Sequence, residues 1–176
     1  MAEHTIRVEE LKEKAPSLHA GDRVYLSGII YTSRDAAHKR LTALLDEGKE
    51  LPLPLEGACI YYAGPTPAEP GAVIGSCGPT TSSRMDRFAP RLLDLGLAAM
   101  IGKGQRSAEV VEAIKRNGAV YLCAVGGAGA LAAQCIKTCE EIAFHDLGCE
   151  SIKRMTVENF PLIVAIDPAG NNLFER

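Results

Sequence analysis

The sequence predicts an α/β fold in which a mixed β-sheet forms the core and helices flank it. Strand-like apolar runs alternate with segments of helical period through the middle of the chain, and further strand-like runs stand near both ends. With 176 residues and 47% hydrophobic residues, the chain can bury a sizeable core. We therefore expect one domain over residues 1–176.

The first part of the chain predicts two strands and a helix. Residues 5–8 are strand-like, and residues 23–30 alternate between apolar and polar side chains, as in a half-buried strand. A helix should begin near Asp35 and end before Gly48, because an apolar stripe repeats at helical spacing. The stripe consists of Ala37, Leu41, Leu44 and Leu45.

A proline-rich connector follows over residues 51–71. It contains five of the ten prolines and is interrupted by a short strand-like run at residues 58–62. Because it lacks serine and charge runs, we expect an ordered loop within the domain rather than a flexible linker.

The most informative stretch covers residues 72–96. The apolar run 72–74 predicts a strand, glycines and a proline over 75–79 predict a tight turn, and a helix should follow and stop at Gly96. Hydroxyls crowd at the expected helix start, and Arg84 stands one turn inside it. Hydroxyls, free amides and a guanidinium at a helix N-terminus suit a carboxylate or a phosphate. The alternative is ordinary capping by Thr80, Thr81 or Ser82, with Arg84 solvated.

The second half continues the alternation of strands and helices. Residues 97–101 predict a buried strand, residues 107–118 a helix capped by serine and ended by glycine, and residues 152–157 and 162–166 two further strands. Lys103 stands between glycines where the first of these strands ends. That place lets it reach an anion with little obstruction, although a flexible surface lysine is the alternative.

A second glycine-rich segment follows the predicted buried strand over residues 119–125. Gly127, Gly129 and Ala132 have the spacing of a dinucleotide-binding loop, and Asp146 falls near the expected place of a ribose-binding acid. The following helix is short and the loop comes late in the chain, so tight packing of strand against helix is the favoured interpretation.

Arg34 and His38 stand four residues apart, straight after a predicted strand. Both side chains can therefore reach the same region over the helix start, and both lie off the apolar stripe. A functional histidine and a solvated or capping histidine are the two open interpretations.

Charge and targeting signals narrow the class of protein. A net charge of −3 argues against a partner bound through nucleic-acid phosphates, so any cationic site must be local. The start of the sequence lacks a basic region followed by an apolar stretch, and the longest clean apolar run is too short to cross a bilayer. We expect a soluble cytoplasmic protein.

Six cysteines raise the question of a metal site. None forms a C-x-x-C pair, and disulfides are not expected without a secretory signal. Cys135 and Cys139 are predicted to share a helix face, where small buried core residues are the favoured interpretation over metal ligands. Cys77 lies beside the central turn.

Residues 78–86, Gly-Pro-Thr-Thr-Ser-Ser-Arg-Met-Asp, resemble the signature of the iron–sulfur hydro-lyases, the class I fumarate hydratases and L-tartrate dehydratases. The resemblance is to their C-terminal domain, which in many organisms is a separate β subunit. Residues 27–40, 101–104 and 160–167 agree with it in the same order. The resemblance implies a swivelling β/β/α domain, similar to the mobile last domain of aconitases.

The resemblance also implies roles for single residues. Thr80 would transfer a proton, and His38 matches an active-site histidine of the tartrate enzymes, so both are catalytic candidates, Thr80 first. The implied substrate-binding residues are Arg34, Thr81, Arg84 and Lys103.

The resemblance places a [4Fe–4S] cluster on a partner α subunit, in an α2β2 assembly, with no metal or cofactor ligand in this chain. The implied reaction is the reversible hydration of fumarate to (S)-malate, in a site shared between the subunits. The alternatives are an L(+)-tartrate dehydratase β subunit, which would convert tartrate to oxaloacetate, and a non-catalytic module that binds small anions.

Overall fold

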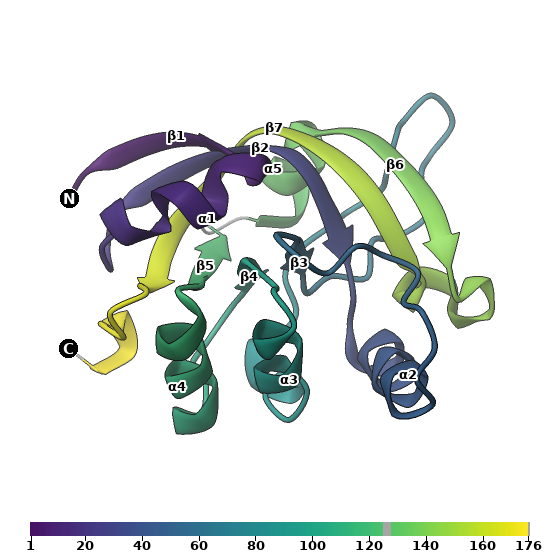
Figure 1. Cartoon of the computed structure of the whole chain (residues 1–176). Helices are drawn as coiled ribbons and strands as arrows, with labels where there is room; N and C mark the ends of the chain where they lie inside the picture. Colours follow the sequence, from purple (N-terminus) through teal and green to yellow (C-terminus); the bar gives the residue numbers. More distant parts are fainter. Residues whose placement is uncertain (125–127, 176) are drawn as a thin grey trace.

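The computed structural model of the chain describes residues 1–124 and 128–175 (Figure 1). Its seven strands form one sheet in the order β1-β2-β3-β4-β5-β7-β6, with an additional pairing of β2 with β7. The strands are β1 (Glu3–Arg7), β2 (Arg23–Thr32), β3 (Cys59–Tyr61), β4 (Ala99–Gly102), β5 (Val120–Ala124), β6 (Ile136–Ala143) and β7 (Ile152–Ile166). The α-helices are α1 (Leu11–Lys14), α2 (Asp35–Asp46), α3 (Ala89–Asp94), α4 (Ala108–Asn117) and α5 (Ala128–Cys135). The 3₁₀ helices are η1 (Val8–Glu10), η2 (Ala15–Ser17), η3 (Ser82–Met85), η4 (His145–Glu150) and η5 (Leu173–Glu175).

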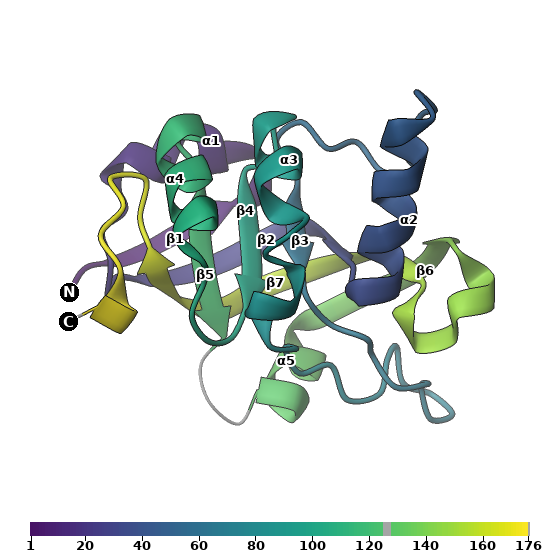
Figure 2. The ribbon, with the colours of Figure 1, turned by 90° about the horizontal axis from the view of Figure 1, so that it is seen from below.

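The sheet is mixed and curls back on itself. Strands β1 to β5 pair with one another in parallel, whereas β7 runs antiparallel to β2, β5 and β6. Because β7 pairs with both β2 and β5, the pairings return to their starting strand, and the long strands arch over β3, β4 and β5 (Figure 1). Helices α2, α3 and α4 lie side by side on one face (Figure 2). The predicted α/β class with a mixed sheet and flanking helices is confirmed, while the swivelling motion stays a prediction.

Alternation along the strands divides the core into two clusters. In β4, Ala99 and Ile101 point into a cluster shared with β1, β2 and β7, whereas Met100 points toward helices α2, α3 and α4. The central strands are thus covered on both faces, which explains their near-continuous apolar sequence.

The predicted helices over residues 35–47 and 107–118 are confirmed as α2 and α4. The hydroxyl of Ser107 accepts a hydrogen bond from the Val110 amide at 3.3 Å, which caps α4. Gly118 ends this helix in the left-handed conformation, with φ 65°.

The expected strand over residues 72–74 is wrong, and the expected helix behind it is divided. Residues 72–74 lie in a largely exposed loop that closes where the Thr66 amide donates to the Ser76 carbonyl at 2.9 Å. Three residues in a proline-rich segment have no neighbouring strand to pair with. Pro90 stands in the first turn of α3, where a missing N–H is harmless, so it begins a new helix after η3 rather than continuing that one.

The two strands expected over residues 152–157 and 162–166 form the single strand β7. Asn159 lies between them with φ 50°, and Pro161 pairs with Tyr25 of β2. The strand changes partner along its length, from β6 and β2 to β5, and this change carries the sheet around the curl.

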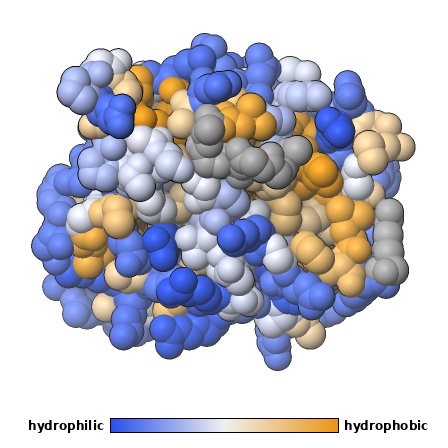
Figure 3. Space-filling model, turned by 180° about the vertical axis from the view of Figure 1, so that it is seen from behind, coloured by the Kyte–Doolittle hydropathy of each residue, from blue (hydrophilic) through white to orange (hydrophobic). Residues whose placement is uncertain are grey.

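The surface is mixed in character. From behind, hydrophobic residues reach the surface in separate areas among hydrophilic ones (Figure 3). The large hydrophobic residues classed as exposed are Met1, Ile29, Val73, Leu95 and Phe174. Within residues 1–124 and 128–175, no helix combines the length and the apolar character needed to span a membrane.

Candidate active site

Three segments meet where β2, β3 and β4 end. These strands are parallel neighbours, so the segments that leave them emerge at one edge of the sheet. Arg34 follows β2, Tyr62 follows β3 and Lys103 follows β4. This edge therefore collects side chains that are far apart in the sequence.

The turn that carries Thr80 and Thr81 lies across this edge. The Thr80 amide donates to the Tyr62 carbonyl at 2.7 Å, and the Ser82 amide donates to the Lys103 carbonyl at 2.9 Å. Thr81 and Lys103 also form an isolated parallel bridge. Main-chain hydrogen bonds thus fix the turn against the ends of β3 and β4, although Lys103 and Thr81 themselves are exposed.

Ordinary capping does not account for the hydroxyl of Thr81. Thr81 occupies the N-cap position of η3, but its side chain makes no capping hydrogen bond. The following residue is used differently, because Ser82 is buried and its hydroxyl lies 2.7 Å from that of Tyr121. Thr81 is exposed and does not cap η3, so the capping alternative does not explain why a threonine stands at this position.

Arg84 joins this turn to the start of α2. Its Nη2 lies 2.7 Å from Oδ2 of Asp35, and about half of its side chain is exposed. The other carboxylate oxygen of Asp35 is buried and has no hydrogen-bond partner among the described residues. Arg34 directly precedes Asp35, so its main chain lies next to this ion pair.

Arg34 is partly buried beside Gly64. A Cβ at Gly64 would lie 3.0 Å from Cδ and Nη1 of Arg34, so glycine lets the main chain pass this close without displacing the side chain of Arg34. The Nε of Arg34 is buried and has no partner within the described part of the chain. Arg84 thus lies in an ion pair with Asp35, the residue that follows Arg34, and the main chain of Lys103 is held against the same turn.

Comparisons with known proteins identify the family of this chain. The family described as Fumarase C-terminus matches residues 2–176. The chain belongs to the fumarase C-terminus family. It is 39% identical over 171 residues to the anaerobic class I fumarate hydratase of Escherichia coli K12, which covers 96% of this chain and 31% of that protein. It is also 41% identical over 156 residues to the mitochondrial fumarate hydratase 1 of Leishmania major, covering 88% of this chain and 28% of that protein.

A shorter relative matches along most of its own length. The putative L(+)-tartrate dehydratase subunit beta of Methanocaldococcus jannaschii is 39% identical over 171 residues, covering 94% of this chain and 88% of that protein. The chain thus spans about a third of the fumarate hydratases that it matches, and it corresponds to nearly the whole of a subunit that is named as one part of an enzyme.

In this member of the fumarase C-terminus family, His38 lies beneath the cationic residues rather than beside them. The expectation that it lies off the apolar stripe is wrong, since its side chain is buried against the rings of Tyr62 and Phe88, with centroids 5.5 and 5.6 Å away. Its Nδ1 lies 2.8 Å from the Ser33 hydroxyl and 2.9 Å from the Arg34 carbonyl oxygen. Burial lowers the pKa of His38 to about 4, with the charge of Arg106 acting in the same direction, so the imidazole is neutral at pH 7.

The dinucleotide interpretation gains no support. Gly127 lies outside the described residues. The predicted strand over residues 119–125 is observed as β5, and its last residue also lies outside the described range. Asp146, the candidate ribose-binding acid, lies in η4, and its carboxylate accepts a hydrogen bond from Nη1 of Arg40 at 2.7 Å. The carboxylate of Asp146 thus forms an ion pair with Arg40 that joins η4 to α2.

The cysteines have different surroundings from those expected. Cys135 ends α5 and Cys139 lies in β6, so the expectation that they share a helix face is wrong. Cys77 is buried beneath the central turn, where burial raises the pKa of its thiol to about 12. In residues 1–124 and 128–175, no three His, Cys, Asp or Glu side chains gather in a way that could hold a metal ion.

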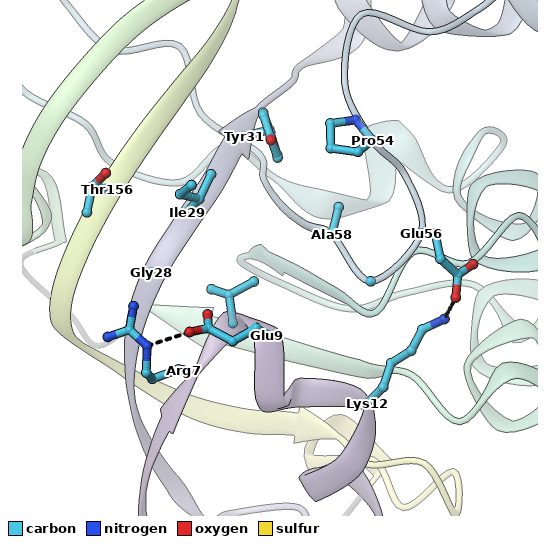
Figure 4. Close-up of a pocket in the computed structure, with 12 residues that line it drawn as sticks. Arg7, Glu9, Lys12, Gly28, Ile29, Tyr31, Pro54, Glu56, Ala58 and Thr156 are labelled. Atoms are coloured by element: carbon cyan, nitrogen blue, oxygen red, sulfur yellow. Dashed lines mark hydrogen bonds and ion pairs between the residues drawn. The ribbon is translucent and has the colours of Figure 1, made fainter.

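A cavity of about 690 Å³ lies away from the candidate residues, between η1, α1 and β2 (Figure 4). Gly28 and Ile29 form part of its wall, and the ion pairs Arg7–Glu9 and Lys12–Glu56 lie along it. None of the candidate site residues lines this cavity. The candidate charged and hydroxyl residues lie instead in the segments that follow β2, β3 and β4 and in the turn held against them.

Proposed function

We propose that this chain supplies the dicarboxylate-binding half of an iron–sulfur hydro-lyase that interconverts fumarate and (S)-malate. The observation that carries the proposal is the fixed turn at the ends of β3 and β4, which presents Thr80 and Thr81 between Lys103 and Arg84. A C4 dicarboxylate has two negative charges, and Arg34, Arg84 and Lys103 together supply three positive ones, of which Arg84 is paired with Asp35 in the free chain.

Each cation suits a separate part of that task. Guanidinium groups bind carboxylates through two parallel hydrogen bonds and so set the angle of the substrate, which is the proposed role of Arg34 and Arg84. Lys103 adds a point charge and stands between two glycines, so no neighbouring side chain obstructs it. Thr81 would donate its exposed hydroxyl to a substrate oxygen.

Hydration of a double bond adds a hydroxyl to one carbon and a proton to its neighbour. The carboxylate next to the protonated carbon gains electron density as the reaction proceeds, and cations at that carboxylate stabilise the transition state. Thr80 is the proposed residue for moving this proton. Its hydroxyl is a weak acid, so the neighbouring cations must stabilise the alkoxide that it forms.

His38 is the other catalytic candidate, and its burial argues for an indirect role. An imidazole with a pKa of about 4, enclosed by Tyr62 and Phe88, is poorly placed to exchange protons with a ligand on the surface. Its contacts with Ser33 and with the Arg34 carbonyl instead fix the segment between β2 and α2.

The [4Fe–4S] cluster that the family resemblance implies finds no set of ligands among the described side chains. Such clusters are held by several thiolates from one site, and in residues 1–124 and 128–175 no three His, Cys, Asp or Glu side chains lie close enough together to hold a metal ion. We therefore assign the cluster to a partner α subunit, where it would act as the Lewis acid toward the substrate hydroxyl. The cytoplasmic location and an α2β2 assembly belong to this proposal.

A second candidate substrate is tartrate. The relative whose length this chain matches is named as a tartrate dehydratase subunit, and tartrate differs from malate by one hydroxyl. The same cations would bind either dicarboxylate, so the choice depends on polar groups around the second hydroxyl.

Reconstitution tests the proposal. The chain is mixed under anaerobic conditions with a cluster-loaded α subunit of the same family, and fumarate absorbance is followed with (S)-malate as the substrate. We expect fumarate to form in the mixture and with neither subunit alone. Oxaloacetate formed from tartrate would reassign the substrate. A stable complex that is inactive with both would favour the non-catalytic anion-binding module.

A further inference from the structure

Arg106 is a buried charge directly beneath the candidate site. Its side chain is fully buried, and its Nε donates to Oδ1 of Asp86 at 2.7 Å. Its Nη2 donates to the hydroxyl of Tyr62 at 3.1 Å. The guanidinium also lies over the rings of Tyr62 and Tyr121, 5.1 and 4.7 Å from their centroids. A buried guanidinium is costly unless it is paired, so an arrangement with this many partners has a defined geometry.

The partners of Arg106 belong to both segments that carry the candidate residues. Asp86 directly follows η3, and its second oxygen accepts a hydrogen bond from the Ser107 amide at 2.8 Å. Asp86 thus links the segment that carries Arg84 to the segment between β4 and α4, which carries Lys103.

Tyr62 and Tyr121 also form hydrogen bonds with the turn and with the loop after β4. The hydroxyl of Tyr121 lies 2.7 Å from Oγ of Ser82 and 2.8 Å from the carbonyl oxygen of Gly104. The carbonyl of Tyr62 accepts the Thr80 amide. Arg106 therefore contacts the residues that make several of the links between the turn and the loop after β4, namely Asp86 and the two tyrosines.

We propose that Arg106 is a positioning residue, which holds Thr80, Thr81 and Arg84 in register with Lys103. It contacts no surface ligand itself, because its side chain is fully buried. Only arginine fits this role, since lysine keeps the charge but lacks the planar fork that reaches Asp86 and Tyr62 together and stacks on a ring. The effect of Arg106 on catalysis rests on the proposed function, whereas its effect on the position of the turn does not.

The geometric consequence is measured on the chain by amide hydrogen exchange, comparing the wild type with Arg106→Lys. The Ser82 amide reports directly, because its acceptor is the Lys103 carbonyl. We expect its exchange to accelerate roughly tenfold or more, while amides in the pairing of β2 with β7 keep their protection. Asp86→Asn, which keeps the size of the side chain, should act in the same way.

Asp167→Asn is the matched control. Asp167 is also buried and accepts hydrogen bonds from the amides of Ala169 and Asn171, each at 3.0 Å, in the turn after β7. This variant should lower the stability of the chain without a selective change at Ser82. Unchanged exchange at Ser82 in Arg106→Lys, or acceleration spread evenly over the sheet, overturns the proposal.

The catalytic consequence is measured in the assembled complex. We expect Arg106→Lys to lower kcat/KM roughly ten- to a hundredfold, as misplacement of binding groups does. In a background of Lys103→Ala the same change should cost much less, because the group that it positions is gone. Equal losses in both backgrounds would show a merely structural role and overturn the proposal. A complex without any hydro-lyase activity would refute the proposed function, and the exchange at Ser82 would still decide the role of Arg106.

Discussion

The buried imidazole of His38 predicts that the chain loses stability between pH 7 and pH 5. In the unfolded chain this histidine has an ordinary pKa of about 6.5, whereas burial lowers its pKa in the folded chain to about 4. Between these values the unfolded state binds a proton that the folded state does not, so unfolding becomes easier as the pH falls. At pH 5 the unfolded histidine is almost fully protonated and the folded one is mostly neutral. The loss attributable to this residue is about 2 kcal/mol of the free energy of unfolding relative to pH 7.

The measurement is urea unfolding at pH 7 and pH 5 for the wild type and for His38→Gln. Glutamine does not titrate, so the difference between the two pH values should shrink by about 2 kcal/mol, whatever the variant loses in packing at both. His19→Gln is the control, because the side chain of His19 is 73% exposed and its replacement should leave the difference nearly unchanged. An identical pH dependence in the wild type and in His38→Gln would refute the reasoning and would mean that His38 is reached by solvent.

Three further outcomes follow from the geometry of the site. Gly102→Ala should destabilise the chain by about 2 kcal/mol in urea unfolding, because its Cβ would lie 1.9 Å from Oγ of Ser82. The double variant Gly102→Ala, Ser82→Ala should recover part of that loss. Additive losses in the double variant would contradict this account. Arg84→Ala should change the free energy of unfolding by less than about 1 kcal/mol, since about half of the Arg84 side chain is exposed. A larger loss would make Arg84 a structural residue. Thr80→Ala should lower kcat in the assembled complex roughly a hundredfold or more, with Thr80→Ser retaining most of it, and equal activity of the two variants would remove the hydroxyl from the mechanism.

The sequence predicted those elements whose pattern is set by local chemistry. The helices α2 and α4 have apolar stripes, and Ser107 and Gly118 mark the ends of α4 in the expected way. Lys103 stands between glycines after a buried strand, and parallel pairing alone then brings it to the same edge as Arg34.

What the sequence could not show depends on contacts between distant segments. The run over residues 72–74 has the composition of a strand, but no strand lies beside it to accept pairing. Nothing in the spacing of residues 152–166 indicated that one strand would pair with β2, β5 and β6 in turn. Closure of the sheet depends on how distant strands pair, and the pattern of residues within one strand does not indicate it.

The buried polar groups were missed for the same reason. His38 looked like a residue outside the apolar stripe of α2, and only the rings of Tyr62 and Phe88, which come from other elements, enclose it. Arg106 and Asp86 stand twenty residues apart in segments rich in charge, so their pairing left no signal in the spacing. A charged residue next to a helix start is usually solvated, whereas Arg106 is buried beneath the candidate site.

The central claim is that Arg84 and Lys103 bind the carboxylates of the substrate. The most direct measurement is kcat/KM for (S)-malate in the assembled complex, for the wild type, Arg84→Ala and Lys103→Ala, with Arg91→Ala as the control. Arg91 lies in α3 and is exposed, with an ion pair to Asp46 at 2.7 Å, so it matches Arg84 in charge and in surface pairing. We predict a loss of roughly a hundredfold or more for each site variant, as expected for removal of one partner of a charge pair, and no more than about a twofold change for the control. Losses in Arg84→Ala and Lys103→Ala no larger than that of Arg91→Ala would contradict the claim.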